Sequence, residues 1–160
     1  MRLTLAAVGR MKSGPERELV DRYLDRLSRA GPSIGLDFAG VVELPESRAA
    51  SADERKRDEA ARLLAALPEK AALALLDEDG KTLGSEPFAE RLGTFRDEGL
   101  RDLVFVIGGP DGLSSELKSG AAMVLALGRM TWPHQLARIL VAEQLYRAAT
   151  ILSGHPYHRA

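Results

Sequence analysis

The sequence predicts a single α/β domain with a mostly parallel sheet of about five strands. Short apolar runs alternate along the chain with longer segments in which apolar residues recur every three or four positions. This alternation is typical of strands joined by crossover helices. Two of the runs, residues 71–76 and 103–107, are continuously apolar, as strands covered by helices on both faces are. No repeat or linker interrupts the pattern, so we expect one domain over residues 1–160.

The N-terminal quarter predicts a strand, a loop, a helix and a second strand. Residues 2–8 form a short β-like run, and residues 9–14 form a basic loop. Residues 15–30 are expected to be helical because five apolar side chains share one face at spacings of three and four, namely Leu19, Val20, Tyr23, Leu24 and Leu27. The second strand region covers residues 34–44 and is broken near Gly40.

The middle of the chain predicts a helix followed by a buried strand. Ser51 is expected to begin the helix, because Glu54 three residues later completes a capping-box pattern. The helix runs to about Leu67, where Pro68 follows. The apolar run at residues 71–76 is the strand.

The second half of the chain repeats this alternation. Ser85 is expected to cap a helix whose apolar face consists of Phe88, Leu92 and Phe95. Residues 103–107 form a buried strand that ends in the loop Gly108-Gly109-Pro110-Asp111-Gly112. A short helix, for which Ser114 is the expected cap, then leads to a strand at residues 123–127.

A long helix is expected near the C-terminus. Pro133 suits its first turn, and Gly154 and Pro156 stop it. Six residues are expected to contact the core, namely Leu136, Ile139, Leu140, Leu145, Ala148 and Leu152. Val141 and Tyr146 lie away from most of that stripe. A second apolar face fits either contact with another copy of the chain or full burial in the monomer.

Composition favours a soluble protein without disulfides. Apolar residues make up 45% of the chain, and no run approaches the roughly 20 apolar residues of a membrane span. The absence of cysteine excludes disulfides and thiol catalysis, and it fits a cytoplasmic protein without a membrane partner. The net charge of −1 does not indicate a nucleic-acid binder. From residue 119 onward, however, four arginines stand against a single acid, Glu143.

Three loops follow the three most apolar strands, at residues 77–80, 108–112 and 128–133. In open α/β sheets ligands bind beyond the carboxyl ends of the strands, so these loops are the default site. Two of the loops carry glycines, which let the backbone approach a ligand closely. The middle loop matches neither GxGxxG nor a P-loop, which disfavours a dinucleotide or triphosphate site. A tight turn without a ligand explains that loop equally well.

Other catalytic classes find little support in the sequence. The acidic run at residues 77–79 has neither EF-hand nor two-metal spacing, and His134 lies far from His155 and His158, so no metal site is expected. No serine lies in GxSxG, which disfavours a Ser-His-Asp hydrolase. The distinctive side chains are instead concentrated in residues 128–159, which hold all three histidines and the single tryptophan. Such side chains are suited to binding a nucleobase and a phosphate.

An ordered set of motifs carries a resemblance to a known family. The set comprises Leu75-Leu76-Asp77 with Gly80 and Ser85, Phe105-Val106-Ile107 with the glycine loop and Leu113, Met130-Thr131-Trp132-Pro133-His134, Arg138 with residues 143–148, and His155-Pro156-Tyr157-His158-Arg159. Each motif alone is weak, but their order and the HPYHR ending are specific. The chain resembles the ribosomal large-subunit methyltransferase H family, the pseudouridine N3-methyltransferases of the SPOUT class.

The resemblance implies a fold, a cofactor and partners. The fold would be a SPOUT-type sheet flanked by helices whose C-terminal part is threaded into a trefoil knot, a feature almost absent from proteins in general. The cofactor would be S-adenosyl-L-methionine, held bent in the knot, with no metal. The protein would be a homodimer with active sites near the interface. The substrate would be a pseudouridine of 23S ribosomal RNA (position 1915), methylated at N3 within the assembled 70S ribosome.

The resemblance also implies a cofactor site in the three loops, and carries over the positions Leu76, Asp77, Gly108, Gly109, Gly128, Arg129, Met130, Thr131, Trp132 and Pro133. Backbone groups there can bond the adenine edge and the ribose, while Leu76, Leu127 and Met130 can enclose the ring faces. The family often has serines near Gly128 and Arg129, so a side-chain hydroxyl is missing here.

The implied chemistry requires removal of a proton from the target nitrogen. N3 is an imide nitrogen, which attacks the sulfonium methyl group in line once its proton has left. The candidate catalytic residues are Tyr157, His158, Arg159 and His134. We expect Tyr157 or His158 to stack on or hydrogen-bond the base, and Arg159 to hold a phosphate or the anionic base. His134 begins a helix whose dipole opposes its protonation, so it is either a base or a neutral donor.

Two alternatives stay open from the sequence. One is a SPOUT-fold module that binds the ribosome without catalysis, which cofactor binding would separate from an enzyme. The other is a tRNA methyltransferase of the same class, against which the HPYHR ending argues. A protein with a net charge of −1 can make few contacts with RNA phosphates. This favours recognition of a shaped ribosomal site over tight binding to free RNA. Arg10 and Lys12 are candidate RNA contacts.

Overall fold

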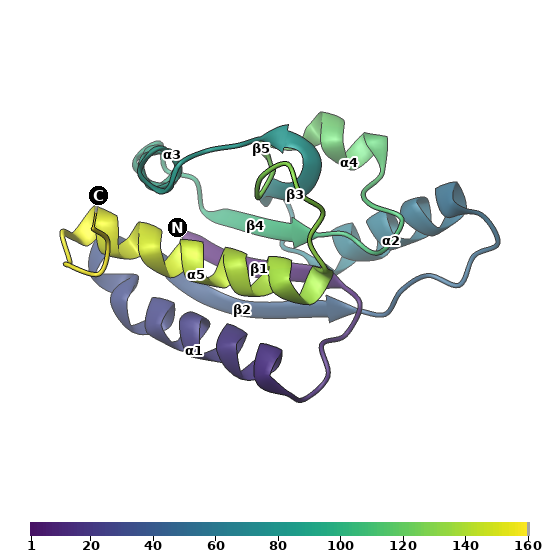
Figure 1. Ribbon diagram of the computed structural model, residues 1–160. Coiled ribbons are helices and arrows are strands. Elements are labelled where there is room, and N and C mark those ends of the chain that lie inside the picture. Colours follow the sequence, from purple (N-terminus) through teal and green to yellow (C-terminus); the bar gives the residue numbers. More distant parts are fainter. Residues whose placement is uncertain (160) are drawn as a thin grey trace.

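The computed structural model describes residues 1–159 and contains a five-stranded sheet in the order β2-β1-β4-β3-β5 (Figure 1). All strand pairings in this sheet are parallel. The strands are β1 (Arg2–Val8), β2 (Asp37–Leu44), β3 (Ala72–Lys81), β4 (Asp102–Ile107) and β5 (Met123–Leu125). The predicted α/β class with a parallel sheet is therefore confirmed.

Helices cover both faces of the sheet (Figure 1). They are α1 (Pro15–Ala30), α2 (Ala52–Ala66), α3 (Ser85–Asp97), α4 (Ser115–Gly120) and α5 (His134–Ser153), with a 3-10 turn at Pro32–Ile34. Buried side chains of α1, α3 and α5 share one core cluster, and those of α2 and α4 share the other. Within residues 1–159, none of these helices has the length and apolar character needed to cross a bilayer.

Strand β4 shows why its sequence is apolar throughout. Leu103, Phe105 and Ile107 belong to the core under α1, α3 and α5. Val104 and Val106 belong to the core under α2 and α4. Successive residues of a strand point to opposite faces, so a central strand covered on both faces has no polar side. The central position of β4 in the sheet follows from this pattern.

Burial within the monomer accounts for part of the second apolar face of α5. Val141 is 3% exposed and Leu145 is fully buried, so burial within the chain explains the second apolar face at Val141. The ring of Tyr146 packs against Tyr23 and Tyr157 at centroid distances of 6.5 and 4.8 Å. The prediction that Leu136 contacts the core is wrong, because this side chain is 40% exposed.

Two local predictions differ from the structure. Strand β2 begins only at Asp37, because residues 32–34 wind into a 3-10 turn that Gly35 ends in the left-handed conformation at φ +74°. Ser85 does not cap α3. The N-cap is Gly84, and the Ser85 hydroxyl donates instead to Gln144 Oε1 at 2.8 Å. Ser51 and Ser114 do cap their helices, as predicted.

The C-terminal part of β3 turns around the end of β5. Leu125 is the strand partner of both Leu76 and Lys81, so residues 77–80 turn around it. The Ala126 amide donates to the Lys81 carbonyl at 3.1 Å. A Cβ on Gly80 would lie 2.4 Å from the carbonyl carbon of Leu125, so only glycine allows this approach. The loops after β3 and β5 are thereby brought together, while the trefoil knot stays a prediction.

Candidate functional site

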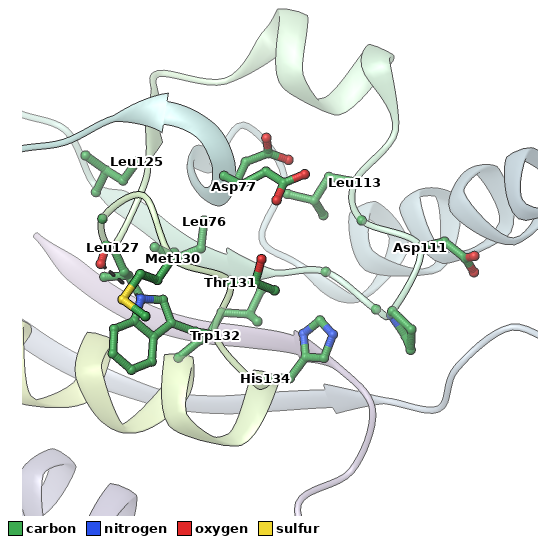
Figure 2. A pocket seen from close by; sticks show the side chains of 18 residues that line it. Leu76, Asp77, Asp111, Leu113, Leu125, Leu127, Met130, Thr131, Trp132 and His134 are labelled. Carbon is green, nitrogen blue, oxygen red and sulfur yellow. Dashed lines mark hydrogen bonds between the residues drawn. The ribbon is translucent and has the colours of Figure 1, made fainter.

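The carboxyl ends of β3, β4 and β5 surround a cavity of about 270 Å³ (Figure 2). Leu76 and Asp77 line it from β3, and residues 108–113 line it from the loop after β4. Further lining comes from the segment that joins β5 to α5 and from the first turn of α5. This is the edge of the sheet at which the sequence predicted a ligand site.

All but two of the predicted cofactor residues line this cavity, namely Leu76, Asp77, Gly108, Gly109, Gly128, Met130, Thr131 and Trp132. Arg129 and Pro133 lie in the same loop but outside the lining, and both are exposed. His134, the first residue of α5, also lines the cavity. The three predicted loops are thus brought together, although they lie far apart in the sequence.

The loop after β4 is a tight turn whose shape depends on glycine. The Gly112 amide donates to the Gly109 carbonyl at 2.9 Å, and Gly112 adopts a φ of +85°. A Cβ on Gly109 would lie 2.9 Å from Glu59 Oε2 and 3.1 Å from Val8 Cγ1. The turn therefore packs directly on the layer behind it and presents backbone groups to the cavity.

The loop between β5 and α5 closes on itself at the mouth of the cavity. The indole Nε1 of Trp132 donates to the Leu127 carbonyl at 3.1 Å. Figure 2 shows Met130 and Trp132 close together on one side of the loop, with Thr131 and His134 on the other. Met130 is 76% exposed and Trp132 is 40% exposed. These apolar surfaces at the mouth suit contact with a planar ring.

A second cavity of about 350 Å³ adjoins the first. The two cavities share Leu76, Leu125, Leu127, Gly128 and Trp132 as walls. The second is further lined by residues 82–85, Phe88, Phe105, Leu140, Val141 and Gln144. Sequence reasoning did not nominate Leu125, Leu113, Ser85 or Gln144 as site residues, although all but Leu125 belong to the motif set. For Leu125, its position at the end of a strand was the available signal.

Lys118 faces the acidic run at residues 77–79, which lies within β3. Asp77 Oδ2 lies 2.7 Å from Lys118 Nζ, and the Asp77 side chain is 8% exposed. Its Oδ1 also accepts the Asp79 amide at 3.1 Å. Among residues 1–159, no group of three or more histidine, cysteine, aspartate or glutamate side chains is arranged to hold a metal ion.

Three of the four predicted catalytic residues lie away from the cavity. The Tyr157 hydroxyl donates to Glu143 Oε1 at 3.1 Å. His158 Nδ1 lies 3.3 Å from Arg147 Nη1, and its Nε2 lies 3.7 Å from Glu86 Oε1. Helix α5 has 20 residues, so it is about 30 Å long. Figure 1 shows the tail folded back at the C-terminal end of α5, whereas the cavity is lined by the first turn of this helix. Arg159 is exposed.

The surroundings of Tyr157 favour its protonated form. Burial raises the pKa of Tyr157 to about 12, and its hydrogen bonds with Tyr23 and Glu143 act in the same direction. The Arg147 guanidinium lies 4.8 Å from the centre of the Tyr157 ring. At neutral pH the phenol therefore stays protonated. It can donate a hydrogen bond to the substrate, but it is not a candidate for the catalytic base.

A buried ion pair fixes the start of α5 to the sheet. Arg138 is 4% exposed. Its Nη1 donates to Glu43 Oε1 at 2.6 Å, while Nη2 donates to the carbonyls of Val8 and Gly9. Burial raises the pKa of Glu43, but the Met11 amide, Arg17 and Arg138 together hold it below its usual value of 4.5. Arg138 lies one helical turn after His134, so this pair sets where His134 meets the cavity.

The chain is similar to known methyltransferases over its whole length. The family model described as predicted SPOUT methyltransferase matches residues 1–158. The ribosomal RNA large subunit methyltransferase H of Brucella anthropi is 64% identical over 160 residues, covering all of both chains. The protein of that name from Rhizobium meliloti is 63% identical over 160 residues, again covering both chains fully.

Similarity to solved structures is weaker. The crystal structure of the SpoU methyltransferase AviRb from Streptomyces viridochromogenes in complex with the cofactor AdoMet is 14% identical, with a TM-score of 0.37. The alignment covers 92% of this chain and 57% of that one. A likeness at this level carries no weight for the assignment of the site.

Proposed function

This chain belongs to the SPOUT methyltransferase family, and we propose that it methylates N3 of a pseudouridine in large-subunit ribosomal RNA, with S-adenosyl-L-methionine as the methyl donor. Full-length relatives at 60–64% identity bear the name ribosomal RNA large subunit methyltransferase H. The observation that carries the proposal is the cavity of about 270 Å³, whose lining coincides with the motif positions of the three loops.

The residues around the cavity fit such a cofactor. Leu76, Leu125 and Leu127 offer apolar walls for a purine ring, and the glycine turn offers backbone amides and carbonyls without side chains in the way. The second cavity adjoins the first across Trp132, which leaves room for a bent ligand. When bound, S-adenosyl-L-methionine supplies an electrophilic methyl group on sulfur. The protein's part is to hold the cofactor, align the acceptor nitrogen and exclude water.

The proposed enzyme acts as a homodimer in which one copy completes the site of the other. The tail residues Tyr157, His158 and Arg159 are suited to a base and its phosphate, yet they lie at the far end of α5 from the cavity of their own chain. Only His134 of the predicted catalytic residues lines that cavity. A tail supplied by a second copy brings both sets of residues to one substrate.

The division of roles follows from the surroundings of each group. Tyr157 donates a hydrogen bond, because its pKa is raised to about 12. His134 lines the cavity at the first residue of α5, so it is the candidate to take the N3 proton. Arg159 stabilises the resulting anionic base or a neighbouring phosphate. His158 lies between Arg147 and Glu86 and orients the tail.

The decisive experiment incubates the protein and labelled cofactor with 70S ribosomes, free large subunits and tRNA, and then maps the modified nucleotide. Label at N3 of a single pseudouridine in 23S ribosomal RNA is the expected result. Label in tRNA would contradict the proposal. Calorimetry with S-adenosyl-L-methionine separates the enzyme from a ribosome-binding module, since a module without catalysis need not bind the cofactor.

A mixing experiment tests the shared site. A chain truncated at residues 154–160 and a His134→Ala chain are each expected to be inactive alone. After unfolding and refolding together in equal amounts, half of the dimers contain one of each, and each mixed dimer has one complete site. Roughly a quarter of wild-type activity should therefore return. No recovery in a mixture shown to contain mixed dimers would refute the shared site.

A further inference from the structure

Helix α2 holds the glycine turn at residues 109–112 from outside the cavity. Arg55 Nε donates to Asp111 Oδ2 at 2.6 Å, and Arg55 Nη2 donates to Asp111 Oδ1 at 2.9 Å. The two residues are 56 positions apart in the chain, and their side chains are 29% and 25% exposed. A two-bond pair between guanidinium and carboxylate fixes orientation as well as distance.

The remaining contacts of Arg55 aim its guanidinium at the turn. Its Nη1 donates to the Ala49 carbonyl at 3.1 Å. The segment before α2 is itself anchored, because the Ser47 amide donates to Glu59 Oε1 at 2.8 Å and the Ser47 hydroxyl donates to Asp58 Oδ2 at 2.6 Å. The segment before α2 therefore holds the Arg55 guanidinium in place where it meets Asp111.

A second contact from the same helix face supports the turn. Glu59 lies one helical turn after Arg55, so both side chains project from the same side of α2. Glu59 is 4% exposed, and its Oε2 lies 2.9 Å from where a Cβ on Gly109 would be. Arg55 thus holds Asp111 while Glu59 packs against Gly109, two positions earlier in the turn.

We infer that Arg55 is a positioning residue for the cofactor cavity, which it serves by holding the turn through Asp111. Arg55 does not line the cavity, whereas residues 108–113 do. Glycine on both sides of Pro110 and Asp111 leaves this segment little intrinsic stiffness. Without the Arg55–Asp111 pair the turn samples open conformations. Part of the binding free energy of the ligand must then be used to order the turn, which weakens binding. The identity of the ligand rests on the proposed function.

The first test compares Arg55→Gln with Arg62→Gln. Arg62 is a matched control on the same helix, because it pairs with Asp58 at 3.0 Å and donates to the Pro45 carbonyl at 2.9 Å without contacting the turn. S-adenosyl-L-methionine is titrated against the fluorescence of the single tryptophan, and steady-state rates are measured. For Arg55→Gln, Kd and KM for the cofactor should rise about threefold to tenfold, with kcat at saturation within about twofold of wild type.

The partner residue gives a second comparison. Asp111→Asn should weaken binding as much as Arg55→Gln, and the double variant should be no weaker than either single one, because both remove the same pair. Arg62→Gln should bind like wild type. Equal Kd values for wild type and Arg55→Gln, or full additivity in the double variant, would overturn the inference.

Hydrogen exchange tests, without any cofactor, whether the Arg55–Asp111 pair holds the turn, an effect we call the brace. The Gly112 amide is bonded to the Gly109 carbonyl at 2.9 Å, so its exchange reports opening of the turn. Exchange of peptides that cover residues 108–113 should be faster in Arg55→Gln and unchanged in Arg62→Gln. Unchanged exchange in Arg55→Gln would refute the brace. Failure of the wild-type protein to bind S-adenosyl-L-methionine would instead refute the proposed function, and hydrogen exchange would still decide on the brace.

Discussion

Substitution of Gly80 by alanine should destabilise the protein by separating two backbone segments. Gly80 lies where the chain leaving β3 passes the end of β5. A Cβ there would lie 2.4 Å from the carbonyl carbon of Leu125, 2.7 Å from its nitrogen and 2.8 Å from the nitrogen of Ala126. All three atoms belong to backbone, so no side-chain rotation relieves the overlap.

The magnitude follows from the required displacement. Ordinary contact begins at 3.4 Å, so the two segments must part by 3.4 − 2.4 = 1.0 Å. That movement breaks the 3.1 Å bond from the Ala126 amide to the Lys81 carbonyl, at a cost of about 1 kcal/mol. Overpacking adds about 1–3 kcal/mol. The sum of about 2–4 kcal/mol corresponds to a fall in Tm of roughly 5–15 °C for a chain of this size.

The assay is thermal unfolding followed by far-ultraviolet circular dichroism, with Gly120→Ala as the matched control. Gly120 ends α4, and a Cβ there would meet nothing within 4 Å. The same substitution at Gly120 should be neutral or raise stability by about 0.4–1 kcal/mol. A Tm for Gly80→Ala equal to that of Gly120→Ala would show that the two segments do not pass as closely as the structure has them.

Three further outcomes are expected. Glu43→Ala leaves the buried Arg138 without its carboxylate partner and should lower the free energy of unfolding, measured by urea denaturation, by about 3–5 kcal/mol. Because the pKa of Glu43 is lowered on folding, the stability it provides is present above its usual value of 4.5 and is lost as the pH falls below it. Tyr157→Phe should flatten the dependence of stability on pH between 10.0 and about 12. The Tyr157 pKa is higher in the folded protein than in the unfolded chain, so the stability it provides is fully present below pH 10.0 and is lost as the pH rises through about 12. Ser51→Ala removes the capping box shared with Glu54 and should lower stability by about 1 kcal/mol, or roughly 2–4 °C in Tm.

Each of these outcomes has a result that would contradict it. If Glu43→Ala unfolds at the urea concentration of wild type, Arg138 is not buried against a single carboxylate. If wild type and Tyr157→Phe lose stability in parallel above pH 10.0, the environment of Tyr157 does not raise its pKa to about 12. Threonine also caps helices, so Ser51→Thr should retain most of the stability, and a Ser51→Thr variant as unstable as Ser51→Ala would contradict the capping role.

Much of the fold could be predicted because local patterns determined it. The bounds of β1 and α1 agree with the prediction to the residue, since an apolar run and a helical stripe each end at proline or glycine. The loops that line the cavity could be nominated because they follow the three most apolar strands of the sequence. These predictions need no knowledge of which elements touch.

The features that could not be predicted depend on tertiary contacts. Serine is a common helix cap, which made Ser85 a candidate, but α5 places Gln144 within reach of its hydroxyl. Arg55 lies on a charged helix that resembles any solvated surface, and nothing in the sequence connects it with Asp111. The separation of Tyr157 from the cavity depends on the length of α5 and on how it packs. Such relations follow from the assembled layers and not from spacing.

Both edges of the sheet are blunted, which bears on how the protein associates. At one edge Leu125 has Leu76 and Lys81 as its two strand partners, so its outer hydrogen-bonding groups are occupied within the chain. At the other edge the register of β2 shifts between Phe38 and Gly40, which interrupts a regular ladder. A second copy is therefore discouraged from adding strands to the sheet. Contact with a second copy would then fall to the helices and loops.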